Sequence, residues 1–257
     1  RMVYCKVTDK YGNSVKTNAV TLMMGSPAKI TKQPSSATVL GNAKAQVSLK
    51  ASGIGLKYKW YYKNVNSSSF KYTSTFKSNT YTVDMNDARS GRQIYCVVTD
   101  KYGNSAKSKV VTLKKGEITK QPSSVSVKKG EVAKTTISAT GDGLTYKWYY
   151  KNVGATSYSL TTSFTGKYYS VSMNESRDGR KIFCRITDKY GNSLDTKTVT
   201  LSMKHTYVEG DVIREATCAL TGEKQYICTD CGKEKIEAIA KLPHALSEPE
   251  LIREPTV

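Results

Sequence analysis

The sequence TDKYGNS fills residues 99–105 and occurs three times in the chain, beginning at Thr8, Thr99 and Thr187. Each copy follows a short apolar run that contains a cysteine: MVYCKV, QIYCVV and KIFCRI. Two further phrases, ITKQPSS and KWYYKNV, recur at the same 88-residue offset that separates the second copy from the third. Repetition at a fixed period indicates an array of similar structural units. We therefore expect the end of one repeat at 1–24 and complete repeats at 25–114 and 115–203.

Within a repeat, apolar and polar residues alternate over short runs that are separated by Gly, Asn and Ser, which is typical of β-strands. In LKYKWYY, residues 56–62, this alternation places Trp60 on one face and Tyr61 on the other. About seven short strands in 88 residues fit a β-sandwich, in whose core Trp60 and Cys96 are expected to meet. The expected strands of the first complete repeat are 46–51, 56–62, 80–84, 93–99 and 107–113.

A Trp on the third strand and a Cys on the sixth resemble an immunoglobulin-like (Ig-like) sandwich. The phrases ITKQP, GLTYKWYYKN, GRKIFC and TDKYGNS resemble, in particular, the Ig-like repeats of secreted and cell-surface proteins of Gram-positive bacteria. The resemblance implies an all-β fold of tandem sandwiches and an extracellular or cell-surface location. It has one departure, because Leu49 and Ile137 stand near the place of the partner cysteine of antibody-type domains. We therefore expect Cys96 and Cys184 to be small buried apolar residues without a bridge.

The TDKYGNS segment contains an Asp and an Asn, which are oxygen ligands that Ca²⁺ accepts. A single carboxylate is a poor calcium site, however, because the ion takes several oxygen ligands. The glycine of each copy suits a turn that needs a positive φ angle. We interpret the segment as the turn between the last two strands.

The charge of the chain is uneven. It has 40 Lys and Arg against 21 Asp and Glu, and from Lys204 onward there are 7 basic and 10 acidic residues. Residues 1–203 therefore hold the other 33 basic and 11 acidic residues, a balance of +22. The positive electrostatic field of this charge would attract anionic polymers. Alternatively, the charge keeps a lysine-rich β surface soluble. Lys outnumbers Arg by 32 to 8, which argues against specific nucleic-acid readout.

The outward face of the Trp-bearing sheet is a candidate binding surface in both complete repeats. Exposed aromatic rings beside cations are common on recognition surfaces. The alternative is cross-strand pairing that stabilises the sheet without a ligand. The candidate residues are Lys59, Tyr61, Lys63 and Tyr95 in one repeat, and Lys147, Tyr149, Lys151 and Phe183 in the next.

From residue 204 the chain changes character. VIREAT at 212–217 returns as LIREPT at 251–256, and His205 returns as His244, both with an offset of 39 residues. We therefore expect a small Cys/His repeat at 204–243, similar to a zinc ribbon, and the start of another at 244–257. The unit resembles a short Cys/His repeat that occurs in tandem in Gram-positive surface proteins. The candidate metal ligands are Cys218, Cys228, Cys231, His205 and His244.

A structural zinc site explains this set most simply, because Zn²⁺ takes four tetrahedral ligands and a CxxCG turn presents two thiolates to one ion. In this interpretation Cys218 comes from a facing hairpin strand, and His205 or His244 completes the site. A disulfide is the alternative, since an extracellular setting is oxidising. Either staple would compensate for the small core of so short a unit.

The sequence favours a non-catalytic function. Only two His are present, so few residues could serve in His-dependent catalysis. No apolar run reaches the about 18 residues that a membrane-spanning helix needs. We expect a fragment of a modular surface or secreted protein whose tandem domains form an adhesive or stalk array. The alternatives are a specific binder of host or cell-wall glycan or of a host protein such as an immunoglobulin, and spacer modules of an extracellular enzyme. The chain could also self-assemble through neighbouring repeats. The two-strand remnant at 1–24 is expected to be disordered or to pair with the exposed edge of a neighbouring sheet.

Overall fold

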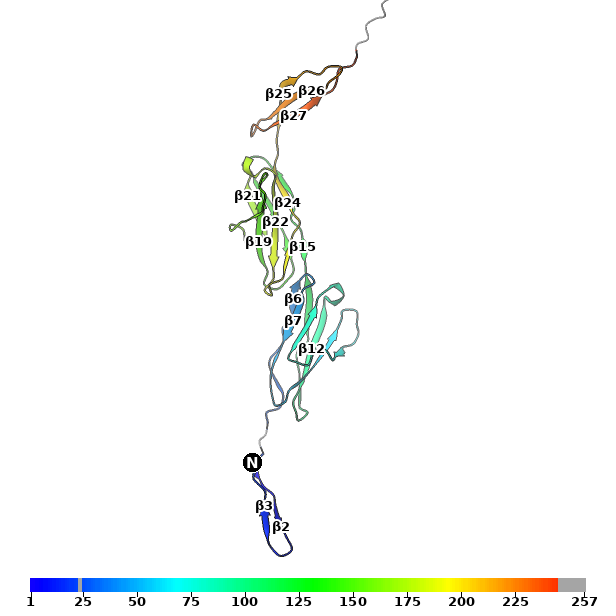
Figure 1. Ribbon diagram of the computed structural model, residues 1–257, viewed down its shortest axis with the longest axis vertical. Helices are drawn as coiled ribbons and strands as arrows, with labels where there is room; N and C mark the ends of the chain where they lie inside the picture. The colour runs from blue at the N-terminus through cyan, green and yellow to red at the C-terminus, as the bar shows by residue number, and fades with distance from the viewer. Residues whose placement is uncertain (23–24, 245–257) are drawn as a thin grey trace, which may run out of the picture. The chain divides into compact units, whose positions relative to one another are not determined.

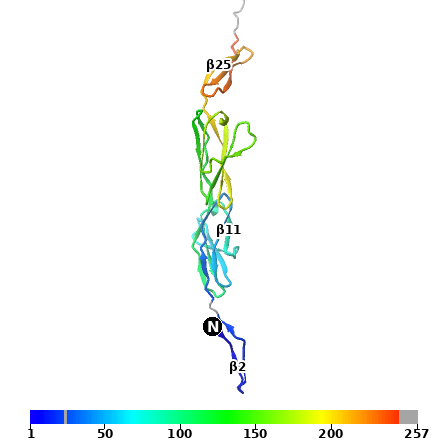
Figure 2. The same cartoon turned by 90° about the vertical axis from the view of Figure 1, so that its left-hand side faces the viewer.

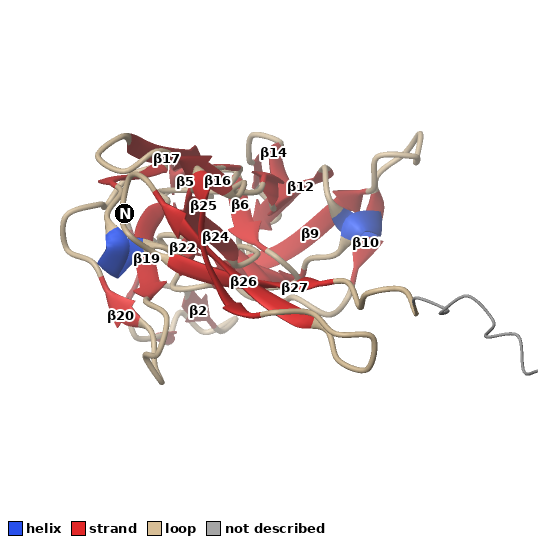
Figure 3. Ribbon diagram, turned by 90° about the horizontal axis from the view of Figure 1, so that it is seen from above, coloured by secondary structure: helices blue, strands red, loops and turns tan. Residues whose placement is uncertain are grey.

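The computed structural model describes residues 1–22 and 25–244, and nearly all of its regular structure is β-strand (Figure 3). The two helical segments of the described residues are single 3₁₀ turns, η1 (Asp87–Arg89) and η2 (Glu175–Arg177). Among the described residues, no helix has the length and apolar character needed to span a membrane.

The described residues divide into two compact units. The first holds the described part of Arg1–Lys120 together with Ser138–Tyr146 and Arg185–Asp195, and the second holds Gln121–Ile137, Lys147–Cys184 and the described residues from Thr196 onward.

The first residues form a hairpin (Figure 1). Strand β2 (Lys6–Thr8) pairs with β3 (Ser14–Lys16), and β1 (Met2–Val3) pairs with β4 (Val20–Thr21). The expectation of disorder was wrong, because the two arms pair with each other. Pairing of the hairpin's outer edges with a neighbouring edge stays a prediction.

The turn of this hairpin is the first TDKYGNS copy. The Asp9 carboxylate accepts hydrogen bonds from the backbone N–H groups of Tyr11 and Asn13, at 2.9 Å each. Gly12 has a φ of +91°, and the glycines of the other two copies lie at +92° and +90°. The interpretation of TDKYGNS as a turn is therefore confirmed.

The first complete repeat is a two-layer sandwich. One layer is a sheet of order β10-β9-β12-β14-β6, with β13 also paired to β12. The other layer contains β11 (Figure 2), which pairs with β7, and the pair β5-β8. The strands are β5 (Lys29–Lys32), β6 (Ala37–Leu40), β7 (Lys44–Ser48), β8 (Lys50–Ser52), β9 (Lys57–Lys63), β10 (Lys71–Thr73), β11 (Thr80–Asp84), β12 (Arg92–Thr99), β13 (Ser105–Lys107) and β14 (Val111–Gly116).

The core of this sandwich is the predicted one. Trp60 on β9 lies directly across from Cys96 on β12, and both are fully buried. Ile94 and Val98 alternate inward with Cys96, while Tyr95 lies on the other face and is half-buried. The alternation of the sequence therefore correctly predicted which side chains enter the core.

Two expected strands are each split in the structure. The run 46–51 is divided between β7 and β8 at Leu49, because β7 pairs with β11 and β8 pairs with β5. The run 107–113 is divided between β13 and β14. There, buried Ser108 donates its backbone N–H to the Cys96 carbonyl at 2.8 Å, and its hydroxyl accepts the Cys96 N–H at 2.9 Å.

The second complete repeat has the corresponding sheet, in the order β16-β24-β22-β19-β20 with β23 paired to β22, and the additional pairs β17-β21 and β15-β18. Trp148 and Cys184 are fully buried, as Trp60 and Cys96 are. The chain is thus all-β with tandem Ig-like sandwiches. The strands are β15 (Ile118–Lys120), β16 (Val125–Val127), β17 (Val132–Thr136), β18 (Ser138–Ala139), β19 (Thr145–Lys151), β20 (Ser159–Leu160), β21 (Tyr168–Ser172), β22 (Arg180–Thr187), β23 (Ser193–Asp195) and β24 (Val199–Met203).

The Cys/His segment forms a three-stranded antiparallel sheet, β25-β26-β27 (Figure 1). Its strands are β25 (Tyr207–Arg214), β26 (Gly222–Cys228) and β27 (Glu234–Ile239). Ala216, Gly222 and Cys228 are its buried residues. So small a core agrees with the expectation that the segment needs a staple.

Candidate metal centre and aromatic faces

Three of the predicted ligands lie together at one end of the small sheet. The ligand atoms of His205, Cys228 and Cys231 are all within 4.8 Å of one another, and the His205 Nδ1 is 3.3 Å from the Cys231 Sγ. Strand pairing explains the approach, because Tyr207 lies opposite Cys228 and His205 precedes Tyr207 by two residues. The CxxCG turn supplies the third ligand.

The turn that carries the two cysteines is closed by its own backbone. The Gly232 N–H donates to the Cys228 carbonyl at 2.8 Å, and the Cys228 N–H donates to the Lys233 carbonyl at 2.9 Å. Gly232 has a φ of +72°, which a residue with a side chain adopts at a cost. This geometry turns both sulfurs to the same side.

The three-residue cluster could hold a metal ion. A tetrahedral ion with bonds of about 2.3 Å to sulfur and about 2.0 Å to nitrogen separates a sulfur from a nitrogen by about 3.5 Å. The Nδ1–Sγ distance of 3.3 Å is close to this value, and the remaining separations among the three ligand atoms are no longer than 4.8 Å. Cys228 is fully buried, and His205 and Cys231 are partly buried.

The electrostatics of the cluster favour one thiolate near neutral pH. Burial by itself raises the pKa of the Cys228 thiol, but hydrogen bonds from the Asp230 backbone, His205 and Cys231 lower it to about 7. The His205 pKa is raised, because hydrogen bonds to Cys228 and Asp178 outweigh the effect of burial. A thiolate beside an imidazole is the donor chemistry that Zn²⁺ prefers.

The structure does not bring Cys218 or His244 into this cluster. Cys218 is exposed in the loop between β25 and β26, at the Gly222 end of β26, whereas Cys228 is at the other end. Six residue steps along a strand span about 20 Å. His244 is exposed beyond β27, whose Ile239 pairs with Gly222, so it too follows the Cys218 end. The predicted facing-strand position of Cys218 is therefore not observed.

A pocket beside the cluster contains a residue that sequence reasoning missed. It is lined by Val153, Glu175, Asp178, Met203, His205, Cys231, Gly232 and Lys233. The Asp178 Oδ2 is 3.0 Å from His205 Nε2 and 2.9 Å from Lys233 Nζ, while its Oδ1 accepts the Met203 N–H at 2.7 Å. Burial raises the pKa of this carboxyl, but these hydrogen bonds outweigh it and lower the pKa to about 2.

The predicted aromatic face of the first complete repeat is a packed cluster. Tyr61 and Tyr95 stack with ring centroids 4.8 Å apart, and the edge of Phe70 meets Tyr95 at 4.9 Å. Lys63 lies over Phe70 at 5.3 Å, and Lys107 lies over Tyr95 at 4.2 Å. The rings are half-buried, so they stabilise one another and still present their edges to solvent.

The second complete repeat rebuilds the same cluster. Tyr149 and Phe183 stack at 5.0 Å, the edge of Tyr158 meets Phe183 at 5.0 Å, and Lys151 lies over Tyr158 at 5.3 Å. Lys59 and Lys147 are exposed on the corresponding strands of the two repeats. The sequence analysis missed three members of these clusters, Phe70, Lys107 and Tyr158. They come from other segments, and the alternation of apolar and polar residues does not determine where those segments lie relative to the central strands.

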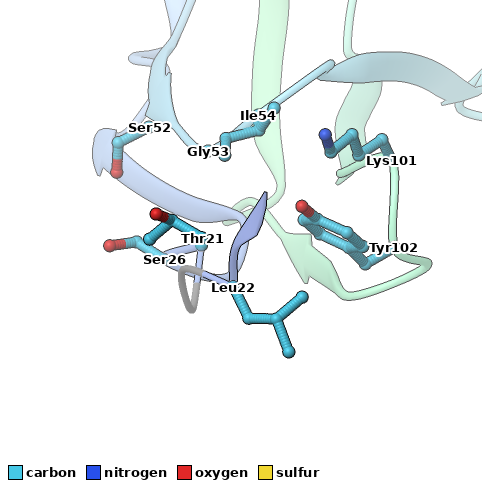
Figure 4. Close-up of a pocket in the computed structure, with 9 residues that line it drawn as sticks. Thr21, Leu22, Ser26, Ser52, Gly53, Ile54, Lys101 and Tyr102 are labelled. Carbon is cyan, nitrogen blue, oxygen red and sulfur yellow. The ribbon is translucent and has the colours of Figure 1, made fainter. Parts of the chain in front are cut away.

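A separate shallow pocket in the first unit offers little chemistry (Figure 4). Among the described residues that line it, Lys101 is the one charged side chain, beside Thr21, Leu22, Ile54 and Tyr102. These described lining residues include no carboxylate, thiol or imidazole that could act as an acid, base or nucleophile.

Comparison with known proteins finds matches only among solved structures, at low sequence identity. No protein-family model matches the chain, and no curated protein matches it. Among solved structures, titin domains A168–A170 align with 14% identity and a TM-score of 0.45, over 77% of this chain and 73% of that one. Extracellular domains 3–5 of Drosophila OTK align with 16% identity and a TM-score of 0.38, over 79% and 70%. The two Ig domains of DIP-gamma align with 15% identity and a TM-score of 0.38, over 70% and 99%.

Proposed function

We propose that the chain is a stretch of a non-catalytic, modular protein that is secreted by a Gram-positive bacterium or displayed on its surface, where tandem Ig-like modules form an adhesive or stalk array. The proposed modules are 1–24, 25–114, 115–203, 204–243 and 244–257. Each complete repeat contains its own buried Trp and Cys, which supports independent folding units of the kind that arrays use.

The observation that carries the adhesive part of the proposal is the duplicated aromatic cluster. Both sandwiches place a stacked ring pair, an edge-on third ring and a lysine at corresponding strands. Half-exposed rings bordered by cations can stack on sugar rings and pair with acidic groups of a glycan or protein. Two copies on one chain also allow bivalent capture of a repetitive target.

A glycan array and a serum-protein array, probed with the full chain, test this proposal. We expect saturable binding that falls at least about tenfold in the double variant Tyr61→Ala and Tyr149→Ala, since stacked aromatic contacts are worth about 1–3 kcal/mol each. The control is Tyr11→Ala, which removes a ring that is 78% exposed in the first hairpin. Equal binding by the wild type, the double variant and Tyr11→Ala would mean that the aromatic clusters stabilise the sheets and do not bind a ligand. Saturable capture of an immunoglobulin would favour the specific-binder alternative.

We further propose that the Cys/His module is folded around a Zn²⁺ to which His205, Cys228 and Cys231 supply three of the four tetrahedral ligands, with a water molecule or a side chain outside this cluster as the fourth. The short separations among the three ligand atoms support this assignment. Native mass spectrometry of the full chain should give a zinc adduct about 63 Da above the reduced apo mass, and a chelator should remove it together with the protection of β25–β27 from amide exchange. A metal-free mass two protons light would instead indicate a disulfide, and peptide mapping would show whether it joins Cys228 and Cys231.

A further inference from the structure

The residue beside the candidate metal centre differs between two repeats that are otherwise closely alike. Asp178 occupies the position of Ser90 in the preceding repeat, 88 residues earlier. Both residues cap the short 3₁₀ turn at the same place, after η2 and η1 respectively. Both also accept the backbone N–H at the end of the last strand, Asp178 from Met203 at 2.7 Å and Ser90 from Lys115 at 3.1 Å. A serine therefore suffices for the sandwich itself.

The aspartate adds a second oxygen, whose hydrogen bonds within the described part of the chain go to the Cys/His segment. Its Oδ2 lies 3.0 Å from His205 Nε2 and 2.9 Å from Lys233 Nζ. The His205 and Asp178 side chains are 12% and 13% exposed, so this contact is largely shielded from water. The repeat that carries the aspartate is the one that is followed by the Cys/His segment.

The hydrogen bond also decides which nitrogen of His205 is available to a metal. With Nε2 as the donor to Asp178, the proton resides there and the lone pair of Nδ1 is free, and Nδ1 is the nitrogen that faces Cys231 at 3.3 Å. Metal-bound histidines commonly donate their other N–H to a carboxylate, which fixes the tautomer and the ring orientation.

We propose that Asp178 is a positioning residue for the metal centre: it orients His205 and thereby makes metal binding and the attachment of the Cys/His module to the sandwich one coupled event. This inference rests on the proposed zinc site. Because coupling is reciprocal, a metal that holds His205 strengthens the contact with Asp178, and Asp178 strengthens metal binding by the same factor.

The test is a Co²⁺ and Zn²⁺ titration of the reduced full chain, with affinities obtained by competition with a chelator. We expect Asp178→Ser to weaken both ions about 10- to 100-fold, the range known for residues that orient metal ligands. Ser90 indicates that the sandwich tolerates this serine, and unchanged tryptophan fluorescence would verify the fold. Asp178→Asn keeps an acceptor oxygen without the charge, so its metal affinity should lie between those of the wild type and Asp178→Ser.

Glu175→Gln is the matched control. It removes the same charge from the same pocket, but Glu175 pairs with Lys129 at 2.5 Å and not with His205. Its metal affinity should stay within about threefold of the wild type, because a partly exposed charge acts only through a screened field. A loss as large as that of Asp178→Ser would overturn the positioning role in favour of general electrostatics.

The cobalt spectrum separates the remaining outcomes. A positioning residue should leave the thiolate-to-cobalt bands in place at saturation, while a change in the ligand-field bands of Asp178→Ser would make Asp178 a direct ligand and contradict the proposal. Equal affinity of wild type and Asp178→Ser would overturn the inference and leave the zinc site standing. A reduced wild type that binds neither ion would overturn the zinc site, and this inference with it.

Trypsin cleavage after the exposed Lys204 provides a second readout, of the attachment itself. Metal should slow this cleavage in the wild type and slow it less in Asp178→Ser at equal metal occupancy. Equal protection in the two proteins would mean that the metal orders the module without coupling it to the sandwich.

Discussion

At the residue scale, each sandwich contains a buried arginine whose hydrogen bonds, among the described residues, go to a tyrosine and an asparagine and not to a carboxylate. Arg92 donates to the Tyr81 hydroxyl at 3.0 Å and to the Asn64 side-chain oxygen at 2.8 Å, and its guanidinium lies over the Tyr62 ring at 4.6 Å. Arg180 repeats these contacts in the other sandwich. We predict that Arg92→Lys lowers the free energy of unfolding by about 1–3 kcal/mol, because lysine cannot reach both acceptors and leaves buried groups unpaired.

Urea unfolding in a Trp148→Phe background measures this effect, since Trp60 then reports on its own sandwich. The control is Arg89→Lys, whose guanidinium donates to the Asp84 carbonyl at an exposed site and should change stability by less than about 0.5 kcal/mol. An Arg92→Lys effect as small as the control would show that the buried network contributes nothing. Sequence alternation placed Trp60 and Cys96 correctly, but Arg92 was missed because its partners come from other segments.

The cysteines provide a second prediction at this scale. Burial raises the pKa of the Cys96 thiol to about 12, so almost none of it is thiolate at pH 8. Iodoacetamide should therefore modify the exposed Cys5 and Cys218 in the folded chain and leave Cys96 unmodified until unfolding. Peptide mass spectrometry measures the labelling of each site. Labelling of Cys96 at the rate of Cys218 would contradict the buried assignment.

At the element scale, register explains which parts of the metal site could be predicted. The CxxCG spacing is local, and it correctly brought Cys228 and Cys231 together. Cys218 was assigned to the site because the sequence does not reveal that β26 lies almost wholly between Cys218 and Cys228. In the sequence, Asp178 is distinguished only by standing where the preceding repeat has Ser90. That difference can be interpreted only when the structure shows which strand ends lie next to the residue.

The TDKYGNS turn yields a prediction about pH. In the third copy, buried Asp188 accepts hydrogen bonds from the Tyr190 and Asn192 N–H groups and from the Leu40 N–H, each at 2.9 Å. Burial raises the pKa of its carboxyl, but these bonds and the Asn192 side chain lower it below the ordinary 3.8. The ionised carboxylate therefore contributes its full stability above about pH 4 and loses it as the pH falls through the lower folded pKa.

In a Trp60→Phe background, in which Trp148 alone fluoresces, we expect the free energy of unfolding to fall more steeply between about pH 4 and pH 2 with Asp188 than with Asp188→Asn. The variant should already be less stable at neutral pH, because an amide oxygen is a weaker acceptor than a carboxylate. The control is Asp84→Asn, whose side chain is 68% exposed. Parallel pH profiles of wild type and Asp188→Asn would show that this carboxylate is not a source of the acid sensitivity.

At the scale of the whole molecule, the charge predicts how the chain meets polyanions. The +22 balance of residues 1–203 is spread over many lysines, so attraction to a sulfated polysaccharide should depend on the total field and not on one site. Retention on such a column should be strong at about 0.01 M salt and lost by a few tenths molar, because the screening length falls from about 30 Å to below about 8 Å.

Two double variants in one sandwich decide whether that field is diffuse or localised. Lys57→Glu with Lys59→Glu reverses two charges on β9, the strand that carries Tyr61. Lys29→Glu with Lys50→Glu reverses two exposed charges on β5 and β8 of the other layer. Each pair changes the net charge by the same amount, so a diffuse field predicts equal reductions in the salt concentration needed for elution. A much larger loss for the β9 pair would instead assign polyanion binding to the aromatic face, and would give the two duplicated clusters an acidic polymer as their common ligand.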